Sequence, residues 1–350
     1  MYKRQDKKSV LVTGGCGFIG VNLAARLLGT GDYAVTVLDN MSTGGAADLE
    51  AALSERGLDH SEVTVVEGDV RDLARCEEAC RGVDAVVHLA AQAGVPQSID
   101  DPFRDAEVNV GGTLNMLEAA RRAGAGMFIF ASSNAPLGAA PPPSREDTAP
   151  RPLSPYGAAK LAGEGYCSAY HASYGLPTVA LRFSNAYGPW SLHKSSVVAR
   201  FIKDGIVTGR LTVYGDGSQT RDLVHVDDIT RAIELTLGSN PEETAGGIFQ
   251  LGTGVETAVL QAAAIVADLI GKGIKIDFAP ARPGEAARSF SYIGKARELL
   301  GYTPEVTLRA GISETLEWFR AHGGPALLRR PPAAVIVRGK KRRSRKKQQT

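Results

Sequence analysis

Apolar residues in the first half of the chain fall into short runs that alternate with longer amphipathic stretches. The runs are rich in β-branched residues and nearly unbroken, which is typical of parallel strands buried on both faces. The stretch Glu107–Arg122 repeats apolar positions with a helical period, as expected for a helix that covers such a sheet. Repeated strand–helix alternation predicts an α/β fold with a doubly wound parallel sheet. The six expected strands are Val10–Thr13, Ala34–Leu38, Val63–Val66, Ala85–Leu89, Met127–Phe130 and Thr178–Phe183.

The alternation weakens after Tyr187, where glycine, proline and charged residues become frequent. We therefore expect a smaller, irregular α/β lobe that binds the substrate beside the sheet. The sheet domain is expected to comprise residues 1–187 together with about 224–252, and the lobe residues 188–223 and 253–322. A proline-rich loop around Pro141–Pro143 follows the fifth strand, at the edge of the sheet where ligands bind in such folds.

The composition is that of an ordinary soluble globular protein, with 350 residues, 43% hydrophobic and 22% charged. No apolar run approaches the roughly 18–20 residues that a membrane-spanning helix needs, and the charged N-terminus has no signal-peptide core. These features exclude the membrane and secreted classes and favour the cytoplasm.

Among the four cysteines, Cys76 and Cys80 are spaced i, i+4, so a metal pair is conceivable there; we expect reduced thiols and no metal.

The charge is distributed unevenly along the chain. The formal net charge is +2, yet residues 329–350 contain ten basic residues and no acidic residue. Residues 9–328 are correspondingly acidic, with a net charge of −11. Because an acidic body does not bind phosphate backbones, nucleic acid is not the expected partner. The segment 323–350 is expected to be a disordered basic tail, and a role on nucleic acid or an anionic surface stays open for that tail alone.

A glycine-rich turn joins the first strand to the following helix. Gly14 permits a tight turn, Gly17 lets the backbone approach a pyrophosphate, and Gly20 lets helix and strand pack closely. The unpaired N–H groups of the helix N-terminus, with Phe18 and Ile19 in its first turn, would hold the pyrophosphate. The pattern is GxxGxxG, and it predicts a Rossmann-type dinucleotide site.

Carboxylates at the ends of the next strands support this site. Asp39 ends the second strand, where it can accept hydrogen bonds from the adenosine ribose. It would repel a 2′-phosphate, so NAD is favoured over NADP. Asp69 follows the third strand and would address the adenine. The other residues expected at the cofactor are Asn40, Val70, Leu89, Ala90 and Ala91.

Tyr156 and Lys160 are spaced i, i+4 and therefore lie on one face of a helix. A tyrosine with the usual pKa of about 10 is a poor base at neutral pH. An adjacent ammonium, together with the positive nicotinamide of an oxidised cofactor, would stabilise the phenolate and lower this pKa. Tyr156 could then take a proton from a substrate hydroxyl while hydride leaves the same carbon. Ser133, at the end of the fifth strand, could hydrogen-bond the same oxygen.

These motifs resemble the extended short-chain dehydrogenase/reductase superfamily, and specifically its nucleotide-sugar 4-epimerases of the UDP-glucose 4-epimerase kind. The resemblance runs from about Ser9 to Ala321, with the motifs in order. It implies a tightly bound NAD that takes and returns a hydride at C4 of a UDP-hexose, through a 4-keto sugar. The residues that carry it include Gly14–Gly20, His88–Ala91, Ser133, Tyr156, Lys160, Asn185–Pro189 and Gly215–Asp222.

The resemblance further implies roles for individual residues. Ser133, Tyr156 and Lys160 would form the catalytic triad, whereas His225 is not expected in catalysis. A homodimer is implied through helices near Glu107–Arg122 and Gly157–Ser173. The substrate-binding residues would be Ser133, Asn134, Tyr156, Asn185, Tyr214, Arg221, Arg282 and Glu285.

The chain departs from the family after Ser133. Sugar 4,6-dehydratases place Asp-Glu directly after the catalytic threonine, and decarboxylating relatives keep the glutamate. Asn134 and Ala135 offer no acid or base there, which disfavours water loss and decarboxylation. The alternatives that stay open are another nucleotide-sugar enzyme (a 2-epimerase, dehydratase or reductase) and a non-catalytic dinucleotide-binding protein. The identity of the sugar is also open.

Overall fold

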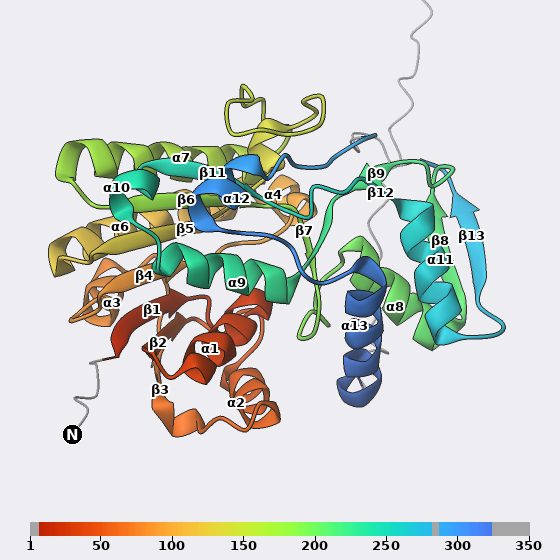
Figure 1. The fold of residues 1–350 in the computed structure, drawn as a ribbon, viewed down its shortest axis with the longest axis horizontal. Helices are drawn as coiled ribbons and strands as arrows, with labels where there is room; N and C mark the ends of the chain where they lie inside the picture. The colour runs from red at the N-terminus through yellow and green to blue at the C-terminus, as the bar shows by residue number, and fades with distance from the viewer. Residues whose placement is uncertain (1–6, 282–286, 324–350) are drawn as a thin grey trace, which may run out of the picture.

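A seven-stranded parallel sheet forms the centre of the protein (Figure 1). The structure is a computed structural model, and it describes residues 7–281 and 287–323. The strand order is β11-β6-β5-β4-β1-β2-β3, and every neighbouring pair is parallel. The strands are β1 (Lys8–Thr13), β2 (Tyr33–Asp39), β3 (Val63–Glu67), β4 (Ala85–His88), β5 (Met127–Ser133), β6 (Thr178–Phe183) and β11 (Gly247–Leu251).

The expected doubly wound α/β fold is confirmed, and each of the six expected strands is present. The largest difference in length is at β5, which continues beyond Phe130 to Ser133. β11 adds a seventh strand by pairing with β6 at the edge of the sheet. Because all strands run in one direction, their carboxyl ends meet at a single edge, and residues far apart in sequence lie together there.

Helices cover both faces of the sheet. Alternate residues of each strand point to opposite faces, so each face has its own hydrophobic core. One face packs against α1 (Phe18–Thr30), α2 (Ala46–Glu55), α9 (Val226–Leu237) and α12 (Gly294–Leu300). The other packs against α3 (Leu73–Ala79), α6 (Gly112–Ala123) and α7 (Pro155–Tyr174). Short segments complete this part: α4 (Val95–Asp100), α5 (Pro102–Ala106), α10 (Pro241–Thr244), and the 3-10 turns η1 (His60–Glu62) and η3 (Ala135–Leu137).

The helix expected over Glu107–Arg122 is divided in two. Its first part, η2 (Glu107–Gly111), is a π-helical turn that continues into α6. The buried side chain of Asn109 accepts a hydrogen bond from the backbone nitrogen of Gln92 (2.9 Å) and donates one to its carbonyl oxygen (3.1 Å). These contacts tie the π turn to the loop that follows β4, and a π turn accommodates one extra residue in a helix.

A smaller lobe lies beside the carboxyl edge of the sheet, on the right of Figure 1. It has a third hydrophobic core, which is separate from the two cores of the sheet. Its helices are α8 (Val197–Thr208), α11 (Val259–Ile270) and α13 (Leu308–His322). Its short strands pair as β8 (Arg210–Tyr214) with β13 (Lys275–Ala279), β9 (Thr220–Arg221) with β12 (Thr257–Ala258), and β7 (Asn185–Tyr187) with β10 (Leu223–His225).

Within the described ranges, no helix combines the length and the apolar character that crossing a membrane requires.

Candidate active site

The glycine turn between β1 and α1 is shaped by close backbone approaches. Gly14 has a φ of 68°, and a Cβ there would lie 2.8 Å from the backbone nitrogen of Ala90. A side chain on Gly20 would collide with the Gly14 carbonyl, so its absence lets α1 pack onto the turn. Gly17 differs, because the nearest atom to its Cβ would be the Gly14 oxygen at 3.3 Å. The backbone on that side is therefore open to a ligand.

The N-terminus of α1 has no side-chain cap and no acidic residue in its first turn. Gly17 is the N-cap, Phe18 is buried, and Ile19 is half-buried. Uncapped N–H groups and the positive end of the helix dipole favour an anion. The turn and the helix therefore form a cradle of the kind that a pyrophosphate occupies. Leu89, Ala90 and Ala91 directly follow β4 beside it and are half-buried.

Asp39 joins the end of β2 to the glycine turn. Its Oδ2 accepts a hydrogen bond from the backbone nitrogen of Cys16 (2.9 Å), and its Oδ1 accepts one from Met41 (2.8 Å). Burial raises the pKa of this carboxyl, while the backbone hydrogen bonds oppose the rise. Each oxygen retains a second lone pair, so the carboxylate can still accept from a ribose hydroxyl.

Asp69 lies after β3, next to Val70, which is buried. Its carboxylate accepts hydrogen bonds from Arg71 through Nε (3.0 Å) and Nη2 (2.8 Å), and from Nδ2 of Asn40 (2.9 Å). These contacts hold its pKa well below the usual range. Asp69 and Arg71 line a cavity of about 610 Å³, together with Leu114 and other residues. Arg71 was not among the residues expected at this site, although it lies two residues beyond Asp69.

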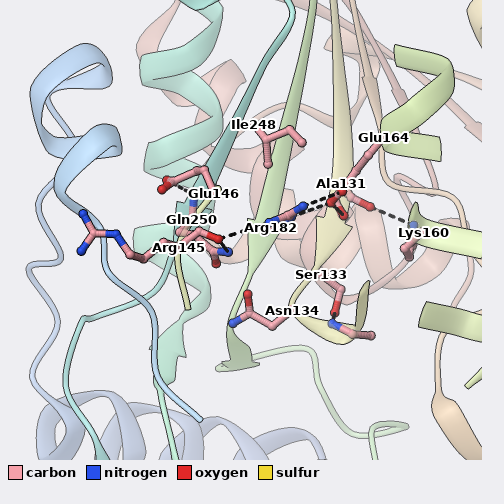
Figure 2. A network of polar contacts seen from close by, with 12 residues as sticks. Ala131, Ser133, Asn134, Arg145, Glu146, Lys160, Glu164, Arg182, Ile248 and Gln250 are labelled. Atoms are coloured by element: carbon pink, nitrogen blue, oxygen red, sulfur yellow. Dashed lines mark hydrogen bonds and ion pairs between the residues drawn. The ribbon is translucent and has the colours of Figure 1, made fainter. Parts of the chain in front are cut away.

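The expected catalytic residues come together at the carboxyl end of β5. Ser154 caps α7 by accepting a hydrogen bond from the backbone nitrogen of Gly157 (3.1 Å). The helix carries Tyr156, whose phenol is hydrogen-bonded to Ser133. It also carries Lys160, whose Nζ donates to the carbonyl of Ala131 (2.8 Å) and lies 5.9 Å from the centre of the Tyr156 ring. Figure 2 shows Ser133, Ala131 and Lys160 in this arrangement.

The pKa values at this site are set mainly by burial. Burial raises the pKa of Tyr156 to about 12; the hydrogen bond from Ser133 opposes this and the charge of Asp105 adds to it. Burial lowers the pKa of Lys160 to about 8, and Asp105 provides the largest opposing effect. Lys160 and an oxidised cofactor were together expected to lower the pKa of Tyr156. In the protein alone the pKa is raised instead, because desolvation of the phenolate dominates.

Asn134 lies between the end of β5 and η3. Its Nδ2 donates to the hydroxyls of Ser184 (3.2 Å) and Ser291 (3.0 Å), which also hydrogen-bond each other (2.9 Å). Its Oδ1 is buried without a hydrogen-bond partner among the described residues. The amide nitrogen is thus held by the protein itself, and the side chain offers no acid or base beside Ser133.

The expected nucleotide-binding residues lie in the smaller lobe and at its junction with the sheet. Asn185 is exposed, and its backbone nitrogen donates to the carbonyl of Asp222 (2.9 Å), the residue after Arg221. Arg221 is half-buried and donates to the carbonyl of Thr220 (2.7 Å). Tyr214 ends β8, with the Arg200 guanidinium 5.0 Å from its ring centre. The remaining two, Arg282 and Glu285, lie outside the described residues.

The N-terminus of α8 is a feature that sequence reasoning missed. Its N-cap residue, Ser196, makes no capping hydrogen bond, and its Oγ is buried without a partner among the described residues. Uncapped backbone N–H groups and a free hydroxyl can donate to an anion. Nothing in the local sequence separates this serine from an ordinary N-cap.

His225 connects the sheet domain to α13. Its Nδ1 accepts the capping hydrogen bond from the backbone nitrogen of Asp227 (3.4 Å), so the neutral ring carries its proton on Nε2. Nε2 faces Glu314 of α13 at 3.7 Å, and Arg56 pairs with Asp227 (3.6 Å). These contacts suit a structural junction between α9 and α13.

The four cysteines are free and buried. Burial raises the pKa values of Cys16, Cys76 and Cys80 to about 12 and also raises that of Cys167, so none is a reactive thiolate. Cys76 contacts the carbonyl of Val70 through its sulfur (3.3 Å).

Comparison with known proteins gives a consistent result. Residues 10–252 match the family model described as "NAD dependent epimerase/dehydratase family". The chain is 39% identical over 316 residues to a UDP-glucose 4-epimerase of Mycolicibacterium smegmatis, covering 89% of this chain and 98% of that protein. It is 33% identical over 318 residues to a dTDP-glucose 4,6-dehydratase of Streptomyces niveus, covering 89% of this chain and 92% of that protein. Its fold is similar to that of Thermus thermophilus UDP-glucose 4-epimerase in complex with NAD, with a TM-score of 0.80, 37% identity, and coverage of 90% and 99% of the two chains.

Proposed function

This chain belongs to the NAD-dependent epimerase/dehydratase family, and from that premise we propose that it epimerises a UDP-hexose at C4. The observation that carries the proposal is the meeting of Ser133, Tyr156 and Lys160 at the carboxyl edge of the sheet, the edge at which the glycine turn also lies. The reaction needs a base that takes a hydroxyl proton and later returns it, and these three side chains supply that function.

The protein fits NAD, the cofactor of its family. Gly14 and Gly17 leave the backbone of the turn unobstructed, the N-terminus of α1 is uncapped, and Asp39 ends β2 with lone pairs to spare. When bound, NAD accepts a hydride from the sugar and gives it back. We propose the holding residues to be Gly14, Gly17, Phe18, Ile19, Gly20, Asp39, Asn40, Asp69, Val70, Leu89, Ala90, Ala91, Tyr156 and Lys160.

In this mechanism Tyr156 accepts the proton of the sugar 4-hydroxyl through its phenolate oxygen. Ser133, already hydrogen-bonded to the phenol, forms a hydrogen bond with the same substrate oxygen and so keeps it next to the phenol oxygen. The ammonium of Lys160 stabilises the negative charge on the phenolate. After the 4-keto sugar presents its other face, Tyr156 returns the proton, so the enzyme ends as it began.

The nucleotide would lie against the smaller lobe. We propose that the diphosphate meets the Arg221 guanidinium and the uncapped N-terminus of α8, since both favour phosphate oxygens. Asn185 is exposed and contacts the backbone of Asp222, the residue after Arg221, and half-buried Tyr214 is proposed to stack on the base. Arg282 and Glu285 stay in this proposal from the sequence alone.

A related reaction is the second candidate, because a dTDP-glucose 4,6-dehydratase is 33% identical over nearly the whole chain. Dehydration needs an acid and a base beyond the tyrosine, whereas Asn134 and Ala135 occupy the two positions after Ser133. The Asn134 amide is already held by Ser184 and Ser291. These facts favour epimerisation, in which the same proton leaves and returns.

Incubation of the purified protein with individual UDP-hexoses, without added NAD, tests the proposal. We expect the 4-epimer to accumulate with no net change in cofactor absorbance. Loss of water or net cofactor reduction would instead identify one of the related reactions. If NAD is bound and no sugar nucleotide changes, the chain is a non-catalytic dinucleotide-binding protein.

A further inference from the structure

A buried ion pair lies between α7 and the sheet, and the proposed chemistry does not use it. The side chains of Glu164 and Arg182 are each 3% exposed. Arg182 donates from Nε to Oε1 and from Nη2 to Oε2 of Glu164, both at 2.8 Å. Ser132 also donates from its hydroxyl to Oε1, at 2.5 Å. Figure 2 shows Arg182 reaching Glu164 across the end of the sheet.

Stability does not explain this pair. Taking two charges out of water costs free energy that their attraction only roughly offsets, and apolar residues of similar volume often serve as well. The pair has a fixed geometry, however, because a guanidinium grips a carboxylate with two parallel hydrogen bonds. Such a two-bond contact fixes the position of α7 along its own axis and its rotation about that axis, both relative to β6.

Three consecutive residues of β5 contact α7 at successive turns. The hydroxyl of Ser133 is hydrogen-bonded to the phenol of Tyr156, and the carbonyl of Ala131 accepts a hydrogen bond from Nζ of Lys160 (2.8 Å). Ser132 holds Glu164, which is one turn beyond Lys160 on the same face of the helix. Glu164 therefore makes the third contact between β5 and the face of α7 that carries Tyr156 and Lys160.

The ion pair also reaches the loop that follows the catalytic serine. Nη1 of Arg182 and Nε2 of Gln250 both approach the carbonyl of Arg145, at 3.5 Å. The backbone nitrogen of Gln250 donates to Oε1 of Glu146 (2.9 Å). The network thus joins β5, β6, β11, α7 and the loop between η3 and α7 (Figure 2).

We propose that Glu164, held by Arg182 and Ser132, is a positioning residue that sets how Tyr156 and Lys160 face Ser133. The inference deepens the proposed function and rests on it. Glu164 also adds negative charge near Lys160 and favours its ammonium form. The other ionisable groups that face Lys160 are Asp105 on α5, His88 on β4, and Tyr156 and Cys167 on α7.

The variant Glu164→Gln keeps the size of the side chain and an oxygen acceptor but removes the charge. We expect its kcat to fall by about 10- to 100-fold, because small misplacements of catalytic groups have effects of this size. KM and the amount of co-purified NAD should stay unchanged. The control is Glu234→Gln, which breaks the half-buried Arg26–Glu234 pair (2.6 Å) between α1 and α9. It should lower the melting temperature and leave kcat unchanged.

A double variant separates position from stability. Glu164→Gln leaves the Arg182 guanidinium buried without its charged partner, so the single variant is expected to melt earlier. Adding Arg182→Met removes that unpaired charge and should restore the melting temperature. We expect kcat to stay low in the double variant, since the two-bond contact that orients α7 is still missing. Recovery of kcat together with the melting temperature would show a merely structural pair and overturn the proposal.

A measurement without substrate keeps this test independent of the proposed function. In protein labelled with ¹³C at the lysine ε-carbon, the Lys160 resonance is identified by its absence in Lys160→Arg. Its titration midpoint should move to lower pH in Glu164→Gln, because a neighbouring negative charge has been removed. An unmoved midpoint overturns the positioning role, whereas lack of turnover in the wild-type protein overturns only the epimerase proposal.

Discussion

Tyr156 lies where burial and a nearby carboxylate both oppose its ionisation. Its pKa is raised to about 12, and Asp105 contributes to the rise, while Ser133 opposes it. A phenol in this state can donate a hydrogen bond at neutral pH but cannot accept a proton. It becomes a base only when positive charge is brought close, and an oxidised nicotinamide carries such a charge. Without a bound cofactor, the protein therefore keeps its proposed base neutral.

Replacement of Tyr156 by phenylalanine removes the phenol oxygen and little else. We expect Tyr156→Phe to lose about 100- to 10,000-fold in kcat, the range for general bases, and to keep its bound NAD. The matched control is Tyr174→Phe, at the exposed end of the same helix (60% exposed), which should behave as wild type. Steady-state kinetics and the NAD content of the purified proteins are the measurements. Full activity in Tyr156→Phe would refute the assigned base.

Lys160 gives the site a pH dependence with a definite sign. Burial lowers its pKa to about 8, so the ammonium dominates below that pH and the neutral amine above it. The charged form is the one that stabilises a phenolate, so kcat should fall as the pH rises through about 8. An arginine keeps its positive charge at these pH values. The residual kcat of Lys160→Arg should therefore not decrease as the pH rises through about 8. A wild-type kcat that does not decrease above this pH contradicts the assignment.

At the scale of the element, the junction of β1 with α1 depends on absent side chains. A Cβ on Gly20 would meet the Gly14 carbonyl and the Gly15 backbone. A few residues along the same helix, Gly29 has nothing within 4 Å of where its Cβ would lie. Two glycines of one helix thus differ completely in their surroundings.

This contrast predicts opposite effects of alanine at the two positions. Gly20→Ala should lower the free energy of unfolding by about 1–3 kcal/mol, as overpacking does, and should purify with less NAD. Gly29→Ala should raise it by about 0.5–1 kcal/mol, because alanine is the better helix former. Urea denaturation and NAD content measure both effects. Equal behaviour of the two variants would contradict the packing role of Gly20.

At the scale of the whole molecule, apolar side chains are exposed on α4, α5 and α7, which pack against one another. Ile99 is 61% exposed, Phe103 83% and Tyr166 37%. Exposed large apolar groups on helices that pack together favour burial against another protein surface. We propose a homodimer that uses this surface, close to the helices for which the sequence analysis expected it.

A charge at the most exposed of these positions should separate the two copies. Phe103→Asp is expected to be a folded monomer by light scattering, because the carboxylate would have to be desolvated in the interface. Phe278→Asp is the control: Phe278 is 59% exposed on β13, in the smaller lobe, and its replacement should leave the dimer intact. If Phe103→Asp has the mass of the wild-type protein, this surface is not the interface.

The sequence by itself determined the features that depend on local pattern. Six strands were predicted from apolar runs, the glycine turn from its spacing, and the Tyr156–Lys160 pair from the geometry of one helix. The seventh strand and the short strands of the smaller lobe were not predicted as elements. Four of these strands have only two or three residues, and polar residues interrupt the apolar run in β8, β11 and β13. The π turn at Glu107–Gly111 was also not predicted, because its Asn109 contacts Gln92, in the loop after β4, and such a contact cannot be read from the local pattern.

Only the tertiary structure decided which charges surround the proposed base. Asp105 raises the pKa of Tyr156 from another helix, and Glu164 meets Arg182 because α7 and β6 pack together. Arg71 makes two side-chain hydrogen bonds to Asp69, and the amide nitrogen of Asn134 donates to two serines that lie far from it in sequence. Burial and electrostatic interaction depend on distances in space, and a chain that returns repeatedly to one edge of a sheet brings together residues whose separation in sequence says nothing about those distances.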